Sequence, residues 1–491
     1  MNKIIKNFKN IKYGPAPEDD TEVINWINKI SSPNKNYING KWNTSRGSKK
    51  IKVINPSTNK KLFNLTISTK KDVDLAVNSA KKAQKKWSSI SPFQRSKYLY
   101  ALARLIQKHS RFLAVLESID NGKPIRETRD IDIPLVARHF YYHAGWAEKL
   151  DKNLKPIGVV GQIIPWNFPL LMLAWKIAPA IACGNTVVLK PAEYTSLTAL
   201  YFAELCIKAN IPNGVINIIT GDGSTGELIT SHPEIQKIAF TGSTEIGKKI
   251  IQSTSSTNKK LTMELGGKSP FIVFEDADLD SAVEGVVDAI WFNQGQVCCA
   301  GSRLLIQESI EKKFIKKLKQ RMEKLRIGNP LDKSIDIGAI VAPVQLQKIN
   351  SLVKKGIKDG AKLWQPSWSC PTEGLFYPPS LFTNVTPASF IAQVEIFGPV
   401  LTSLTFRKPS EAVAIANNTP YGLAASIWSE NINLALDIAP KIKAGVIWIN
   451  STNLFDASCG FGGFKESGFG REGGSEGIRA YTKNKLPEKK I

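Results

Sequence analysis

Short apolar segments of strand length alternate with helical segments through the middle of this chain. Residues 186–189, 215–219 and 237–240 are dominated by apolar side chains, which is typical of strands buried on both faces of a parallel sheet. Residues 198–209, between the first two of these segments, have the pattern of a helix. Because parallel strands need such crossover connections, the sequence predicts an α/β fold with a doubly wound sheet.

The same alternation begins again after residue 267, which predicts a second lobe. Residues 271–274 are a predicted strand, residues 282–291 a predicted helix, and residues 417–449 contain another strand–helix–strand unit. A chain of 491 residues also exceeds one ordinary domain. We therefore expect a first lobe at 1–264, a second at 265–466 and a C-terminal return segment at 467–491.

Nothing in the sequence predicts a membrane span, a secretory signal or a metal site. The longest apolar stretch, residues 170–183, is interrupted by Lys176 and Pro179, and the basic residues 1–13 lack an apolar core. The six cysteines include no C-x-x-C pair, and the four histidines show no zinc spacing. We expect a cytoplasmic protein with reduced thiols.

A cysteine in a glycine-rich turn and a carboxylate among apolar residues are the strongest catalytic candidates. Cys298 lies in the run FNQGQVCCAG, with Cys299 as its neighbour, and Glu264 lies 34 positions upstream in MELGGK. A thiol presented by such a turn is a candidate nucleophile, and partial burial suits a carboxylate to act as a base. Taken alone, Cys298 could also be a small buried cysteine and Glu264 a surface carboxylate.

Four further segments follow predicted strands, at the sheet edge where α/β folds bind ligands. In PWNFP, residues 165–169, the Asn167 amide and the Cys298 N–H can donate to an oxyanion, although a structural turn is the alternative. KPAE, residues 190–193, is a ligand contact or a solvated loop. Two glycine loops, residues 221–226 and 240–247, compete for a phosphate, and the second opens a helix.

Together these motifs resemble the active site of the aldehyde dehydrogenases over residues 37–472. Residues 131–140 and 286–305 look most like the family-16 enzymes, which are usually longer. The resemblance implies a Rossmann-type NAD-binding lobe, an α/β catalytic lobe and NAD-dependent oxidation of an aldehyde to a carboxylic acid. It makes Cys298 the nucleophile of a thiohemiacetal and a thioester, and Glu264 the base of hydrolysis. Lys176 and Glu472 match positions near a proton path to Glu264.

The resemblance also implies the binding residues. Lys190 and Glu193 would bind the adenosine ribose, and the carboxylate of Glu193 favours NAD over NADP. The predicted cofactor contacts are Ile164, Pro165, Trp166, Lys190, Glu193, Gly223, Phe240, Gly242, Ser243, Gly247, Leu265, Gln345, Glu395 and Phe397. The predicted substrate tunnel, which would suit an apolar or aromatic aldehyde or a cationic one, consists of Phe168, Met172, Trp175, Val297, Phe455 and Phe461.

The formal net charge of +24 also suits nucleic acid or an anionic membrane. The lysines are spread along the chain without a finger, helix-turn-helix or RNP-like pattern, so we expect no specific nucleic-acid binding. NAD is an anion that the same field would favour.

Two further functions compete with aldehyde oxidation. One is a catalytically weak homologue that acts as a binding or scaffold subunit. The other is an enzyme that passes the thioester to coenzyme A. The joint presence of Cys298 and Glu264 disfavours both.

Assembly is expected to depart from the family tetramer. Only residues 150–156 stand where the family inserts a two-stranded arm, and they are too few for two strands and a turn. The tail after Tyr481 carries Pro487, which should hamper strand pairing. We expect a homodimer, with a second aldehyde dehydrogenase-like subunit as the alternative partner.

Overall fold

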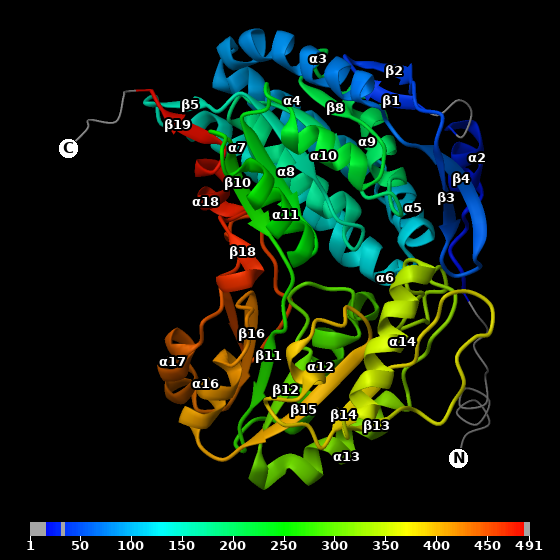
Figure 1. Cartoon of the computed structure of the whole chain (residues 1–491), viewed down its shortest axis with the longest axis vertical. Coiled ribbons are helices and arrows are strands. Elements are labelled where there is room, and N and C mark those ends of the chain that lie inside the picture. The colour runs from blue at the N-terminus through cyan, green and yellow to red at the C-terminus, as the bar shows by residue number, and fades with distance from the viewer. Residues whose placement is uncertain (1–15, 31–34, 486–491) are drawn as a thin grey trace, which may run out of the picture.

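The chain forms two α/β lobes, one above the other along the long axis of the molecule (Figure 1). This computed structural model describes residues 16–30 and 35–485. The basic segment 1–13, predicted not to be a secretory signal, and Pro487 lie outside the described residues. The α/β prediction is confirmed, with one large sheet in each lobe.

The first sheet has eight strands in the order β18-β10-β9-β6-β7-β8-β1-β2. Its parallel centre consists of β6 (Val159–Ile163), β7 (Thr186–Lys190), β8 (Ile216–Ile218), β9 (Lys237–Thr241) and β10 (Lys260–Glu264). The antiparallel edge strands are β1 (Lys35–Ile38), β2 (Lys41–Thr44) and β18 (Gly468–Phe469). The chain order reverses between β6 and β9, and ligands bind beyond the carboxyl ends at such a switch point.

Helices cover both faces of this sheet, as the predicted crossovers require. They are α3 (Lys70–Ser89), α8 (Pro169–Ala182), α9 (Leu197–Lys208), α10 (Gly223–Ser231) and α11 (Thr244–Thr254). Helix α8 is buried along its whole length, because it packs against β7, α9 and two helices that precede it in the chain, α4 (Pro92–Lys108) and α7 (Ile133–Lys149). Apart from α3, the other helical elements that precede it are α2 (Thr21–Ile30), α5 (Ser110–Asn121), α6 (Ile125–Glu127) and the π-helical turn η1 (Thr128–Asp132).

The second sheet has seven strands in the order β13-β14-β15-β12-β11-β16-β17. Six are parallel: β11 (Pro270–Val273), β12 (Arg303–Gln307), β14 (Ser380–Thr383), β15 (Val400–Phe406), β16 (Ala424–Trp428) and β17 (Val446–Ile449). The edge strand β13 (Lys362–Trp364) is antiparallel. Its helices are α12 (Leu279–Ile290), α13 (Glu311–Met322), α14 (Pro343–Lys358), α15 (Phe390–Gln393), α16 (Pro409–Asn417) and α17 (Ile432–Ile438).

Several short elements complete the chain. A hairpin that the sequence analysis did not predict is formed by β3 (Lys50–Asn55) and β4 (Lys60–Thr66). The 3-10 turns are η2 (Phe292–Gly295), η3 (Glu308–Ile310), η4 (Ala439–Lys441) and η5 (Lys465–Ser467), and the last helix is α18 (Gly474–Arg479). Among the described residues, no helix is long and apolar enough to cross a membrane.

The prediction that strand pairing is hampered in the tail after Tyr481 is wrong. Strand β5 (Leu154–Pro156) pairs antiparallel with β19 (Thr482–Asn484), and the Lys485 N–H donates to the Asn153 carbonyl at 2.7 Å. The two strands lie side by side at one flank of the molecule (Figure 1). The bridge, residues 150–156, supplies only one of the two strands. The tail supplies the second one, and its paired residues precede Pro487.

Candidate active site

One cavity gathers most of the predicted site residues beyond the carboxyl ends of β6, β9 and β10. Its lining comprises Pro165, Trp166, Asn167, Phe168, Leu171, Met172, Trp175, Thr241, Gly242, Ser243, Glu264, Leu265, Gly266, Val297, Cys298, Cys299, Gln345, Lys348, Glu395, Phe397, Phe455 and Phe461. The three segments 165–175, 241–266 and 297–299 come from different parts of the chain. The switch point of the first sheet and the turn before Cys298 thus meet at one cavity.

The turn that carries Cys298 is held in a left-handed conformation. Asn293, Gln294 and Gly295 have φ angles of 46°, 54° and 72°. A side chain at Gly295 would bring its Cβ within 2.1 Å of the Gly398 carbonyl oxygen, so only glycine fits. Backbone strain of this kind persists where the surrounding structure enforces it, often at functional sites. The Gln294 side chain enforces it here, since its Oε1 accepts from the Gly338 N–H at 3.1 Å.

Cys298 and Cys299 both line the cavity but differ in solvent exposure. Cys298 is half-buried, whereas Cys299 is 2% exposed and its Sγ lies 3.8 Å from Asn453 Oδ1. The contact with Cys299 and burial raise the pKa of the Cys298 thiol well above its ordinary value. Geometry therefore favours Cys298 as the thiol that a ligand in the cavity would meet.

Glu264 lies at the carboxyl end of β10, and the structure leaves its carboxylate without a protein partner. Neither oxygen has a hydrogen-bond partner among the described residues, although the side chain is buried. Burial and the neighbouring charge of Glu472 raise the pKa of Glu264 well above its ordinary value. Gly462 leaves room for it, since a Cβ there would lie 2.9 Å from Glu264 Oε1. A buried carboxyl group without a protein partner is suited to receive a proton from a water molecule.

A buried ion pair stands behind Glu264. Lys176 on α8 forms an ion pair with Glu472 and also donates to Thr241 Oγ1 at 2.7 Å. Both ionic side chains are fully enclosed, and the second Glu472 oxygen has no hydrogen-bond partner among the described residues. Glu472 also exchanges main-chain hydrogen bonds with Phe461 of the cavity wall. The two residues predicted to lie on a proton path therefore lie next to the candidate base.

Asn167 is tied to the nucleophile segment. Its Nδ2 donates to the Gln296 carbonyl at 2.9 Å, and its own carbonyl accepts from Asn293 Nδ2 at 2.8 Å. An amide nitrogen carries two hydrogens, so one remains for a ligand oxygen in the cavity. The side chain and the Cys298 main chain are therefore fixed relative to each other, as an oxyanion site requires.

The predicted cofactor residues divide into two groups. Eight line the cavity, while six lie outside its lining: Ile164, Lys190, Glu193, Gly223, Phe240 and Gly247. Lys190 Nζ donates to the Gly221 carbonyl at 2.8 Å and lies 3.7 Å from a Glu193 oxygen. The ammonium thus connects the KPAE segment with the first glycine loop at the end of β7.

The second glycine loop offers a phosphate site of the expected kind. Ser243 caps the eleven-residue helix α11, and its Oγ accepts from the Ile246 N–H at 3.3 Å. At Gly247 a Cβ would lie 2.5 Å from Leu265 Cδ2, so the helix can approach this closely only with glycine there. The free N–H groups of a helix start attract anions. The loop after β9 therefore fits a pyrophosphate better than the loop at Gly223, which lies outside the cavity lining.

The opposite wall of the cavity comes from the second lobe. Glu395 Oε1 accepts from the Gly267 N–H at 2.9 Å, and Gln345 Nε2 donates to the Phe397 carbonyl at 2.8 Å. Phe397 has a φ of 59° and packs edge-on against Trp166 at 5.1 Å between ring centroids. These contacts bring the second lobe against the PWNFP segment and enclose the ligand space from both sides.

The six predicted tunnel residues all line the cavity. Trp175 lies 5.4 Å from Phe461 and 6.2 Å from Phe455, and the two phenylalanine rings are 5.7 Å apart. The walls around the thiol are therefore largely aromatic, which favours an apolar, aromatic or cationic ligand.

Five lining residues were missed by the sequence analysis: Leu171, Thr241, Gly266, Cys299 and Lys348. Helical spacing could have found two of them. Leu171 shares a face of α8 with Phe168 and Trp175, and Lys348 lies three residues after Gln345 on α14. The other three directly follow or precede predicted residues, so their positions carried a weaker signal.

The fold and the cavity define a two-lobed α/β protein that presents a cysteine thiol beside a buried carboxyl group. The profile of the aldehyde dehydrogenase family matches residues 42–486. The chain therefore belongs to the aldehyde dehydrogenase family, which confirms the superfamily resemblance.

Individual relatives agree with this assignment. The chain is 46% identical to the putative aldehyde dehydrogenase DhaS of Bacillus subtilis, over 93% of this chain and 95% of that protein. It is 42% identical to aldehyde dehydrogenase family 2 member B4, mitochondrial, of Arabidopsis thaliana, over 96% and 91% of the two chains. Its structure matches an NAD⁺ complex of an aldehyde dehydrogenase from Bacillus cereus with a TM-score of 0.90, 38% identity and 96% and 98% coverage.

Proposed function

We propose that this protein oxidises an aldehyde to the carboxylic acid with NAD as the electron acceptor. The observation that carries the proposal is the single cavity that holds Cys298, Glu264 and Asn167 together. Family membership agrees with it, and relatives that are themselves named aldehyde dehydrogenases favour catalysis over a scaffold role.

The chain's own residues fit NAD on both sides of the switch point. The start of helix α11 offers N–H groups to a pyrophosphate, and Lys190 and Glu193, which lie 3.7 Å apart, would bind the adenosine ribose. Glu395 and Phe397 would hold the nicotinamide end against Trp166. When bound, NAD would accept the hydride that the oxidation removes.

The residues around the thiol account for the other steps. Cys298, as the thiolate, attacks the aldehyde carbon, while Asn167 and the Cys298 N–H bind the oxyanion. Oxidation of this thiohemiacetal leaves a thioester on Cys298. Glu264 then takes a proton from water, which attacks the thioester and releases the acid. Lys176 and Glu472 would pass that proton away from Glu264.

Retention of a base in the cavity supports hydrolysis over transfer to coenzyme A. The substrate class follows from the aromatic wall of Trp175, Phe455 and Phe461, which favours apolar, aromatic or cationic aldehydes. A purified chain that binds NAD should form NADH with at least one aldehyde of an aliphatic, aromatic and amino-aldehyde panel. NAD binding without NADH formation across the whole panel would contradict the proposal.

We also propose the division of the chain into lobes and its location in the cell. Residues 1–264 would form the cofactor lobe, 265–466 the catalytic lobe and 467–491 the returning segment, since β18 joins the first sheet after the second is complete. The six free cysteines support a reducing, cytoplasmic location. The finer likeness to family 16 stays a prediction, and neither the Bacillus subtilis relative nor the Arabidopsis thaliana relative carries that family's name.

A homodimer is the proposed assembly, with a second aldehyde dehydrogenase-like subunit as the alternative. The β5–β19 pair is only three residues long on each strand, which supports a shortened arm. Light scattering on the purified chain at low micromolar concentration should give the mass of two protomers. A mass of four protomers would mean that another surface, or this short pair, supports the tetramer.

A further inference from the structure

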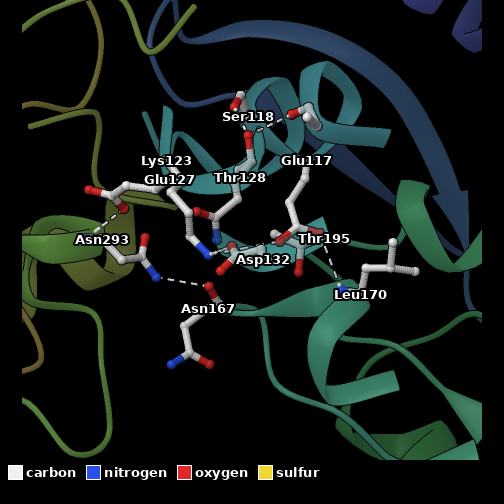
Figure 2. Close-up of polar contacts among 12 residues, drawn as sticks. Glu117, Ser118, Lys123, Glu127, Thr128, Asp132, Asn167, Leu170, Thr195 and Asn293 are labelled. Atoms are coloured by element: carbon white, nitrogen blue, oxygen red, sulfur yellow. Dashed lines mark hydrogen bonds and ion pairs between the residues drawn. The ribbon is translucent and has the colours of Figure 1, made fainter. Parts of the chain in front are cut away.

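A buried cluster of acids lies behind the nucleophile turn and takes no part in the steps above. It comprises Glu117 on α5, Glu127 at the end of α6, and Asp132 at the end of the π-helical turn, with Lys123 among them (Figure 2). Lys123 forms an ion pair with Asp132, lies 3.8 Å from a Glu117 oxygen and stands 3.8 Å from the centre of the Phe168 ring. The cluster thus borders the cavity wall from the side opposite the ligand.

Glu127 reaches from this cluster to the turn that carries the nucleophile. Its Oε2 accepts from the Asn293 main-chain N–H at 2.9 Å, across 166 positions of sequence. Asn293 is the first left-handed residue of that turn and is fully buried. Glu127 therefore satisfies a main-chain donor that would be costly to leave buried without a partner.

Asn293 also connects the turn to Asn167, whose side-chain amide is the proposed oxyanion donor. Its Nδ2 donates to the Asn167 carbonyl at 2.8 Å and lies 3.3 Å from the Gln296 carbonyl. The Asn167 side chain donates to the same Gln296 carbonyl. Figure 2 shows Glu127, Asn293 and Asn167 joined in this order.

We infer that Glu127 is a positioning residue, which acts through Asn293 to hold the Cys298 turn and the Asn167 amide in one fixed arrangement. The inference rests on the proposed function, because it concerns the geometry of the same reaction. It assigns Glu127 no contact with substrate or cofactor, since its side chain is not part of the cavity lining.

The charge of the cluster indicates which property of Glu127 matters. Three buried carboxyl groups face one ammonium group, so full ionisation would bury uncompensated negative charge. Burial raises the pKa of Glu117 and of Glu127 to about 8 each, and the ion pair of Lys123 is with Asp132. Glu127 therefore acts as a neutral hydrogen-bond acceptor near pH 7, and a glutamine oxygen can replace it.

The experiment compares three variants in steady-state kinetics. Glu127→Ala removes the acceptor and should lower kcat by about 10- to 100-fold through misplacement of the reacting groups. The KM values for NAD and aldehyde should stay within about threefold, because the binding residues are untouched. Glu127→Gln keeps the acceptor and should restore most of kcat. Asp72→Ala is the control: Asp72 is also a buried carboxylate that accepts main-chain N–H groups, but at the start of α3.

A measurement without substrate separates this inference from the proposed function. In the wild type and in Asp72→Ala, alkylation followed by mass spectrometry should label Cys298 and leave the buried Cys299 protected. Glu127→Ala should lose that selectivity. If Glu127→Ala fails to fold, Asn293→Asp tests the next contact in the series, because it keeps the main-chain donor to Glu127 and replaces the amide donor to Asn167 with an acceptor.

The outcomes are distinct. Wild-type kcat in Glu127→Ala or Asn293→Asp overturns the inference, as does a loss of kcat in Asp72→Ala equal to that in Glu127→Ala. A Glu127→Gln variant as poor as the alanine variant overturns the acceptor role. Absence of activity in the wild type, with the alkylation pattern as expected, would instead count against the proposed function.

Discussion

Replacement of Glu264 by glutamine should separate the two halves of the reaction. The carboxylate has no hydrogen-bond partner among the described residues and is enclosed, so an amide of the same size fits without breaking a protein contact. Glutamine cannot accept a proton from water. A general base typically contributes about 10²- to 10⁴-fold, so steady-state turnover should fall by about that factor. Formation of the thioester needs no proton transfer to Glu264 and should survive.

The assay is rapid mixing of enzyme, NAD and excess aldehyde with observation of NADH. The variant should produce a burst approaching one NADH per active site, followed by a slow steady state. Because the pKa of Cys298 is raised above its ordinary value, the thiolate fraction is small near pH 7, and the burst rate should increase with pH. Complete loss of the burst would refute this reasoning and place Glu264 at the generation of the thiolate.

Two other substitutions test electrostatic features of the fold. Burial raises the pKa of Asp120 to about 8. The folded state therefore keeps a proton that the unfolded state releases near pH 4. The free energy of unfolding consequently falls as the pH rises from about 4 to about 8. Asp120→Asn should remove this fall, which amounts to up to about 5 kcal/mol at pH 8. Denaturant titrations of the wild type and the variant at several pH values measure it. A difference in the free energy of unfolding between the two proteins that does not change with pH would contradict this prediction. Glu193→Ser removes a carboxylate from the proposed ribose site. Relief of a repulsion of about 1 kcal/mol between this carboxylate and the 2′-phosphate should raise the ratio of kcat/KM for NADP to kcat/KM for NAD about fivefold. An unchanged ratio would mean that the 2′-phosphate lies elsewhere.

The parallel strands were predictable because each is a short apolar run. Strands β7 and β9 begin at the predicted residues and end one residue later than predicted, because full burial leaves a continuous apolar signal. The edge strands carry no such signal. Strand β2 reads KWNT and is only half-buried, and β18 has two residues, so pairing partners far along the chain decide both.

The site was predictable where its residues are contiguous. Cys298, Asn167 and Glu264 belong to runs that identify them locally, whereas the role inferred for Glu127 depends on a contact with Asn293 that no local pattern indicates. The β5–β19 pair was not predicted for the same reason: its two strands lie more than 300 positions apart in the chain. Residues that act within one contiguous run can be predicted from the sequence. Contacts between segments that are distant in the chain can be identified only once the fold is known.

The central claim is that the Cys298 thiol, and not its neighbour, forms the covalent intermediate. Substituting each cysteine by serine and measuring NADH formation tests it most directly, because a hydroxyl group is a far weaker nucleophile than a thiolate near pH 7. Cys298→Ser should nearly abolish turnover while NAD binding is retained. Cys299→Ser should keep most of it, since Cys299 is buried and contacts Asn453. Full activity in Cys298→Ser with loss in Cys299→Ser would contradict the account.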